Sequence, residues 1–224
     1  MRPVERLPRP SRPALAVLGL ACLVAFLVVL VVAVRTRPGQ RLDELLFGVV
    51  LNTLPPGLRL ALDEFARRWA IVVLAPLTAA LAVTALLRRR RRGAVLALAL
   101  PVVVAPVTLW MRDAGVVRPS LGVGGYAHNT FPSVHAAAVF SLLVGLLAVW
   151  PVRLERWHIA LLAGVAALAG LGNVAWYAHR PADVTGSFLL VAGAALCGWA
   201  LLDPRPHRPT VSRRDRERQR VPDG

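Results

Sequence analysis

Long apolar runs separated by short arginine-rich segments are the main pattern along this 224-residue chain. Six runs come close to the roughly 20 apolar residues that a helix needs to cross a bilayer. They cover residues 14–34, 70–87, 93–111, about 133–150, 159–178 and 184–202. Because lipid offers no partner to an unpaired backbone group, a membrane-spanning run of this kind must be helical. The pattern therefore predicts an all-α integral membrane protein, in which residues 14–202 form one six-helix bundle.

The arginines predict how this bundle is oriented. Arg88–Arg92 separate the second and third runs, and further arginines precede the first run, separate the fourth from the fifth, and follow the sixth. With six spans, all four segments fall on the same side of the membrane, and basic loops mark the cytoplasmic side. The first run exceeds the roughly 7 to 15 residues of a secretory signal core, so we expect an uncleaved span. Both termini are then cytoplasmic, with basic tails at 1–13 and 203–224, the second of them disordered.

Residues 35–69 fall on the opposite, outer side and carry a second pattern. Apolar residues recur at intervals of three and four on both sides of a Pro-Pro-Gly break at residues 55–57. This spacing predicts amphipathic helices that lie on the membrane surface or cap the bundle. The alternative is an ordinary connecting loop that has no part in binding.

Composition also favours a membrane protein over a protein that binds nucleic acid. The chain is 56% hydrophobic, its net charge is +15, and all 27 of its basic residues are arginine. A charge of this size can indicate binding to phosphate backbones, but these arginines are concentrated between apolar runs and in the tails. We therefore expect no nucleic-acid partner. Heavy use of Ala, Val, Leu, Arg and Pro favours a GC-rich genome and thus a bacterial cell membrane.

Polar and ionisable side chains cluster at the outer ends of the predicted spans. They are Arg118, Ser133, His135, His179 and Asp183. Such groups are costly at a membrane boundary unless they are solvated or paired, so their clustering indicates a functional site. The alternative is a set of interfacial residues that are wetted by the outer aqueous layer.

The spacing of these residues fits phosphoryl transfer. Asp183 lies four residues after His179, so its carboxylate can orient the imidazole as a nucleophile at the start of the sixth span. Ser133 can cap the fourth span, whose free N–H groups favour an anion. His135 is near enough to this anion site to protonate a leaving oxygen, and Arg118 offers a planar fork of donors. Such a set requires no metal and no other cofactor.

These residues resemble the motifs of the type 2 phosphatidic acid phosphatase (PAP2) superfamily, which also includes the vanadium haloperoxidases. The family pattern is K-x6-R-P, then P-S-G-H, then S-R-x5-H-x3-D. Its counterparts here are Arg118-Pro119, Pro132 to His135, and His179 with Asp183. The resemblance covers about residues 111–186, and membrane members of the family show the same six-span layout.

The resemblance implies a metal-independent phosphatase that acts on a lipid. In the family, the third-motif histidine attacks phosphorus to form a phosphohistidine, the aspartate orients it, and the second-motif histidine protonates the leaving group. These roles fall on His179, Asp183 and His135, and phosphate binding falls on Arg118 and Ser133. The resemblance therefore implies hydrolysis of a lipid phosphomonoester or pyrophosphate at the outer face. A polyprenyl pyrophosphate, phosphatidic acid and phosphatidylglycerol phosphate are all candidate substrates.

All three motifs depart from the family pattern. The lysine of the first motif falls on Met111, the glycine of the second on Val134, and the Ser-Arg pair of the third on Gly172 and Asn173. Two cationic phosphate ligands are thus missing from their expected positions. Loss of one preorganised donor can cost about 3 to 4 kcal/mol of transition-state stabilisation.

Three nearby side chains are candidates to replace these donors. Arg112 follows the lysine position by one residue, Asn173 can donate a neutral hydrogen bond, and Arg180 can turn inward. For both arginines, the alternative is that they reach interfacial water. The missing cations also support a second hypothesis for the whole chain, a membrane binding or scaffold protein that keeps the fold with little turnover. A small transporter is a third hypothesis, although no charged residue is placed at mid-span.

Overall fold

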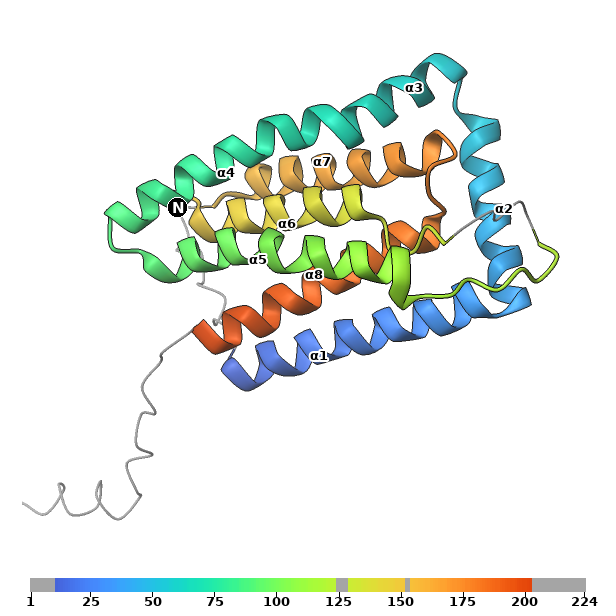
Figure 1. Cartoon of the computed structure of the whole chain (residues 1–224). Coiled ribbons are helices and arrows are strands. Elements are labelled where there is room, and N and C mark those ends of the chain that lie inside the picture. Colours follow the sequence, from blue (N-terminus) through green and yellow to red (C-terminus); the bar gives the residue numbers. More distant parts are fainter. Residues whose placement is uncertain (1–10, 124–128, 152–153, 203–224) are drawn as a thin grey trace, which may run out of the picture.

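The computed structural model in Figure 1 is a bundle of long helices. It describes residues 11–123, 129–151 and 154–202, and within these ranges every regular element is helical. The helices are α1 (Arg12–Val29), α2 (Arg37–Thr53), α3 (Pro56–Glu64), α4 (Ala70–Leu87), α5 (Arg91–Trp110), α6 (Val134–Val149), α7 (Arg156–Ala175) and α8 (Pro181–Leu202). The predicted tail at 203–224 and most of the tail at 1–13 lie outside the described residues.

Three π-helical turns extend these helices. They are η1 (Leu30–Val34) after α1, η2 (Phe65–Trp69) between α3 and α4, and η3 (Met111–Gly115) after α5. A π turn forms i→i+5 hydrogen bonds in place of i→i+4 and thus takes up one more residue, and such turns are frequent at functional sites. Side chains in and after these turns therefore leave the register that an α-helical count would assign to them.

The helices confirm the prediction of an all-α membrane bundle. In the described residues, five continuous helices are long and apolar enough to cross a membrane: Arg12–Val34, Pro56–Leu87, Arg91–Gly115, Arg156–Ala175 and Pro181–Leu202. The helix of the fourth predicted run, α6, has 16 residues and is therefore about 24 Å long. It contacts α4, α5, α7 and α8, and most of its residues are buried. The shortest of the six is thus the central helix of the bundle.

One end of the bundle carries a cluster of arginines, and the other end is covered by a helix. Arg88–Arg92 lie at and after the turn between α4 and α5, at the left end in Figure 1, where α8 also ends. We call this the arginine end. At the opposite end α2 lies across the ends of the other helices, and we call this the α2 end. Arg88–Arg92 and α2 therefore lie at opposite ends of the bundle.

The segment 35–69 differs from the expected pair of surface helices. After Pro56 nothing interrupts the helix, which continues through η2 into α4 as far as Leu87, so only α2 lies across the bundle. The buried residues of α2 are Gly39, Gln40, Asp43 and Phe47. Its large exposed apolar residues are Leu42, Leu45, Leu46 and Val49. The apolar face of α2 therefore points away from the bundle, and its polar face covers the α2 end.

The helix Pro56–Leu87 packs very closely against α7 at Gly172. A Cβ added to Gly172 would overlap the carbonyl oxygen of Leu62 and lie 2.7 Å from the Cβ of Ala66. Helix backbone on both sides leaves no flexible group that could move aside. The absence of a side chain at position 172 therefore sets the distance between these two helices.

We expect Gly172→Ala to lower the free energy of unfolding by about 1–3 kcal/mol, because the added methyl group overfills a tight contact. Gly164→Ala on the same helix is the matched control, since a Cβ there meets no atom within 4 Å. It should instead stabilise the protein by up to about 1 kcal/mol, because alanine favours helix over glycine. Thermal unfolding in detergent measures both changes. Equal stabilisation by the two substitutions would contradict the close packing at Gly172.

Candidate active site

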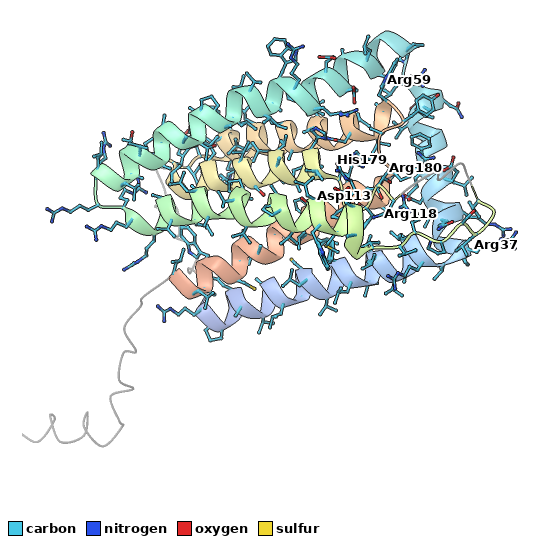
Figure 2. The ribbon with its side chains drawn as sticks, viewed as in Figure 1. Arg37, Arg59, Asp113, Arg118, His179 and Arg180 are labelled. Carbon is cyan, nitrogen blue, oxygen red and sulfur yellow. The ribbon has the colours of Figure 1, made fainter. Side chains whose placement is uncertain are left out.

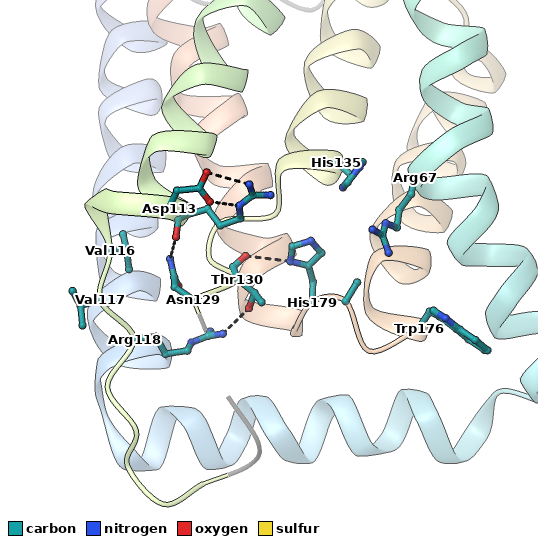
Figure 3. Close-up of a pocket in the computed structure, with 12 residues that line it drawn as sticks. Arg67, Asp113, Val116, Val117, Arg118, Asn129, Thr130, His135, Trp176 and His179 are labelled. Atoms are coloured by element: carbon teal, nitrogen blue, oxygen red, sulfur yellow. Dashed lines mark hydrogen bonds and ion pairs between the residues drawn. The ribbon is translucent and has the colours of Figure 1, made fainter. Parts of the chain in front are cut away.

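A cavity of about 840 Å³ opens at the α2 end of the bundle. Its lining residues are Arg67, Arg112, Asp113, Val116, Val117, Arg118, Asn129, Thr130, His135, Trp176, Ala178 and His179. Figure 3 shows that these side chains come from distant parts of the chain and face a common space. Four of the seven predicted site residues, His135, His179, Arg112 and Arg118, are among them.

His179 lies in the short link between α7 and α8 and is nearly buried. Its Nδ1 is 3.1 Å from the backbone oxygen of Thr130 and 3.5 Å from Oδ2 of Asp183. Two acceptors on this side favour a proton on Nδ1. Nε2 then carries the lone pair, as a nucleophile requires.

Asp183 lies directly behind the cavity in the first turn of α8, which begins at Pro181 as predicted. Its side chain is fully buried and accepts hydrogen bonds from the hydroxyl of Thr130 at 2.6 Å and from the backbone N–H of Arg180 at 2.9 Å. Its Oδ1 is paired with Arg118 at 3.0 Å. These contacts hold the carboxylate in one orientation beside His179.

Arg118 connects the loop after η3 to this carboxylate. Its Nη2 donates to Asp183, and its Nη1 donates to the hydroxyl of Thr130 at 2.8 Å. The side chain is 1% exposed, yet the residue lines the cavity. Figure 2 shows Arg118 and His179 together at the α2 end, whereas Arg37 lies apart from them on α2. The guanidinium is therefore fixed in place before any ligand enters.

A second buried carboxylate, Asp43 of α2, lies close to the same arginine. Its Oδ1 accepts a hydrogen bond from the backbone N–H of Ala182 at 2.8 Å, and its Oδ2 is 3.9 Å from Nη2 of Arg118. The pKa of Asp43 is raised to about 6, because burial and the nearby charge of Asp183 outweigh the opposing effects of the Ala182 N–H and Arg118. The polar face of α2 thus adds an ionisable group next to the site.

We expect the protein to lose stability as the pH rises through the range from about 4 to 6. The folded-state pKa of Asp43, about 6, lies above its ordinary value of 3.8, so in this range the folded chain binds the proton more tightly than the unfolded chain. The free energy of unfolding therefore falls by about 3 kcal/mol across the window and is level above it. Thermal unfolding of wild type and Asp43→Asn between pH 4 and 8 tests this. The stability of the variant should not show this decrease between about pH 4 and 6. An identical pH dependence of stability in both proteins would contradict the raised pKa of Asp43.

His135 and Arg112 lie on the side of the cavity formed by α6 and η3. His135 is the second residue of α6, directly after its N-cap residue Ser133 and Val134. Arg112 lies in the π turn η3 and donates to both carboxylate oxygens of Asp113, at 2.7 and 3.2 Å. Arg112 lines the cavity although its number differs by one from the lysine position of the family.

Ser133 and Asn173 lie beneath the cavity and are completely buried. The Ser133 hydroxyl accepts from the backbone N–H of Ala136 and donates to Oδ1 of Asn173, both at 3.3 Å. Asn173 donates in turn to the backbone oxygen of Ala169 at 2.8 Å. Neither side chain is among the described residues that line the cavity. In this structure they hold the start of α6 against α7, and their direct contact with phosphate stays a prediction.

The inward turn considered for Arg180 is not found. Its Nε donates to Glu44 of α2 at 2.9 Å, and its guanidinium lies 3.8 Å from the ring centroid of Phe47. Two contacts with α2 thus direct this side chain away from the cavity, whose described lining does not include it. Arg180 instead ties the α7–α8 link to α2.

Four residues that shape the site were not predicted from the sequence. Thr130 and Asn129 line the cavity just before the second motif, and the amide of Asn129 donates to the backbone oxygens of Met111, Arg112 and Phe131. Their position within a few residues of Pro132 was the only available signal. Asp43 and Arg67 lie far from every motif, so no local spacing could identify them.

Comparisons with known proteins agree with this architecture. A crystal structure described as the first transmembrane PAP2-type phosphatidylglycerolphosphate phosphatase from Bacillus subtilis has a similar fold, with a TM-score of 0.61. It is 21% identical and covers 82% of this chain and 94% of its own. No curated protein sequence matches the chain.

The family comparison covers the region that carries the motifs. The PAP2 superfamily model matches residues 106–208. This range begins within α5 and runs past the end of α8, so it includes all seven predicted site residues. Residues 106–208 thus match the PAP2 superfamily, and the several apolar helices are those of a multi-pass membrane protein.

Proposed function

We propose that this protein is a membrane phosphatase that hydrolyses a phosphomonoester or pyrophosphate carried by a lipid. The main support is the chain of contacts from Arg118 through Asp183 to His179 at the edge of a cavity that also contains His135. A nucleophile, its orienting carboxylate, a cation and an acid are together the groups that phosphoryl transfer requires. The similar structure from Bacillus subtilis is described as a phosphatase, which agrees with this reading.

The first half of the proposed reaction forms a phosphohistidine. Nε2 of His179 attacks phosphorus while the bond from phosphorus to the lipid oxygen breaks, and protonated His135 gives its proton to that oxygen. Asp183 and the carbonyl of Thr130 stabilise the positive charge that develops on the imidazole, because both face Nδ1. In the second half, His135 removes a proton from water, the water oxygen attacks phosphorus, and the P–N bond breaks to release phosphate and neutral His179.

The proposed phosphate ligands surround this position. Arg118 and Arg112 both line the cavity and offer planar forks of donors that match phosphate oxygens. The start of α6 adds N–H groups and the positive end of a helix dipole. Ser133 and Asn173 support this helix start from beneath. None of these groups requires a metal ion, and we propose a metal-independent reaction.

The charges of the bundle support a direction for the site. Basic segments favour the cytoplasmic side of a membrane, and Arg88–Arg92 lie at the end opposite the cavity. We therefore propose that both termini are cytoplasmic and that the cavity opens at the outer face of a bacterial cell membrane. The phosphate headgroup of a lipid in the outer leaflet then lies at the level of His179.

A second candidate function is binding of lipid phosphate with little or no turnover. One observation favours it: Asn173, at the position of the family's third-motif arginine, is buried and hydrogen-bonded to protein, so it brings no positive charge to the cavity. A protein with this defect can retain the fold and a weak anion site without efficient catalysis.

Release of inorganic phosphate by the purified protein in detergent separates these functions. Phosphatidic acid, phosphatidylglycerol phosphate and a polyprenyl pyrophosphate are offered in parallel, with and without EDTA. We expect release from at least one lipid and no effect of EDTA. Binding of the lipids without release from any of them would favour the scaffold, and inhibition by EDTA would contradict the metal-independent reaction.

A further inference from the structure

We propose that Arg67 of η2 supplies a cationic phosphate ligand that the family places on the helix corresponding to α7. This inference rests on the proposed function and adds a binding residue outside every family motif. It starts from the two consecutive positions, Gly172 and Asn173, where the family carries its Ser-Arg pair.

The helix α7 provides no cation to the cavity from these positions. Asn173 is 0% exposed, and its side chain is bonded to Ala169 and Ser133. Gly172 has no side chain, and its surface is covered by Leu62 and Ala66 of the neighbouring helix. A larger residue at position 172 would hold that helix further away.

The neighbouring helix carries Arg67 directly after this contact. Ala66 lies 2.7 Å from where a Cβ of Gly172 would be, and the next residue is Arg67. Figure 3 shows Arg67 facing His179 across the cavity, with His135 beside them. The close approach that glycine permits at position 172 therefore brings a cation from another helix next to the position that lacks the family's arginine.

The contacts of Arg67 leave its donors accessible to a ligand. It forms an ion pair with Asp63, one helical turn earlier, at 3.4 Å, and its side chain is 38% exposed. A long pair in such a setting is weak, and a guanidinium has five N–H donors. Asp63 can therefore orient the side chain without occupying the edge of the guanidinium that faces the cavity.

The site as a whole then has three arginines around one anion. Arg67 lies in the π turn η2, Arg112 lies in the π turn η3, and Arg118 lies in the loop that follows. Both arginines that lie outside the family motifs are thus placed by π turns, which are frequent at functional sites. Three cations from separate elements can surround a tetrahedral phosphate although the lysine and arginine of the motifs are absent.

Binding of orthovanadate, a tetrahedral anion that resembles phosphate, tests this proposal independently of turnover. Isothermal titration compares wild type, Arg67→Gln, Arg67→Lys and Arg68→Gln in detergent. Arg68 is the matched control, because it is exposed and its guanidinium lies over the ring of Trp69, 5.3 Å from the centroid. We expect Arg67→Gln to weaken binding at least about tenfold and to lower kcat/KM on the best lipid by about 10² to 10³.

The other two variants show whether charge at position 67 is the cause. Arg67→Lys should recover part of the affinity, because it restores the charge without the planar fork, and Arg68→Gln should bind as the wild type does. Thermal unfolding of each variant identifies any loss that is due to misfolding. If Arg67→Gln misfolds, the lysine variant decides: restored folding and binding support the proposal, and restored folding without binding overturns it.

The outcomes also distinguish this proposal from the proposed function. Unchanged orthovanadate affinity in folded Arg67→Gln would overturn the role of Arg67, even if the wild type releases phosphate from lipids. Conversely, binding that depends on Arg67 in a protein that hydrolyses none of the lipids would support the anion site and reject the phosphatase.

Discussion

His179→Ala is expected to lower phosphate release by at least about 10⁴-fold. The imidazole is the only group in the proposed reaction that bonds to phosphorus. Nδ1 faces two acceptors, the carboxylate of Asp183 and the backbone oxygen of Thr130, so the ring proton stays on Nδ1 and Nε2 keeps its lone pair. Without the ring, the arginines can still bind the phosphate but no covalent intermediate can form.

Release assays with the best lipid measure this loss, and labelled substrate identifies the intermediate. Wild type stopped during turnover with alkaline denaturant should retain acid-labile phosphate on the protein, and His179→Ala should retain none. His158→Gln is the control, since this histidine lies at the start of α7 at the arginine end, where its Nδ1 accepts from the N–H of Glu155. Equal release by wild type and His179→Ala would show that other residues perform the reaction.

Arg118→Met is expected to lower the free energy of unfolding by about 3–5 kcal/mol and to abolish turnover. The side chains of Arg118 and Asp183 are 1% and 0% exposed, so removal of the arginine leaves a buried carboxylate without its countercharge. Asp43 is also buried, and it loses the nearby positive charge of Arg118 at the same time. The destabilisation comes from these uncompensated charges, and methionine keeps most of the volume of the side chain.

Chemical denaturation at pH 7 in detergent tests this effect against a matched substitution. Arg37→Met replaces an exposed arginine of α2 and should leave stability nearly unchanged. The double variant Arg118→Met with Asp183→Asn should regain part of the lost stability, because the buried charge is removed together with its partner. An Arg118→Met protein as stable as Arg37→Met would show that the pair is not what stabilises the α2 end.

The helical bundle and the contact between His179 and Asp183 could be predicted from the sequence alone. A run of apolar residues that enters lipid must form a helix whatever surrounds it, so hydropathy was enough to find all six core helices. The pairing of His179 with Asp183 was also local, because residues four apart at a helix start are neighbours. Pro181 indicated that start correctly. These features depend on contacts within one turn or one span.

Which other side chains reach the cavity depends on how the helices pack together. Arg67 lines the cavity and Asp43 lies next to it because η2 and α2 pack against helices more than a hundred positions away along the chain. The same packing directs Arg180 toward Glu44 and closes Ser133 and Asn173 beneath the cavity. Helix rotation and π turns set these directions, and both follow from how whole helices fit together. The spacing of residues within a motif does not encode how helices pack. A motif can therefore indicate a catalytic pair but not the cations that complete its site.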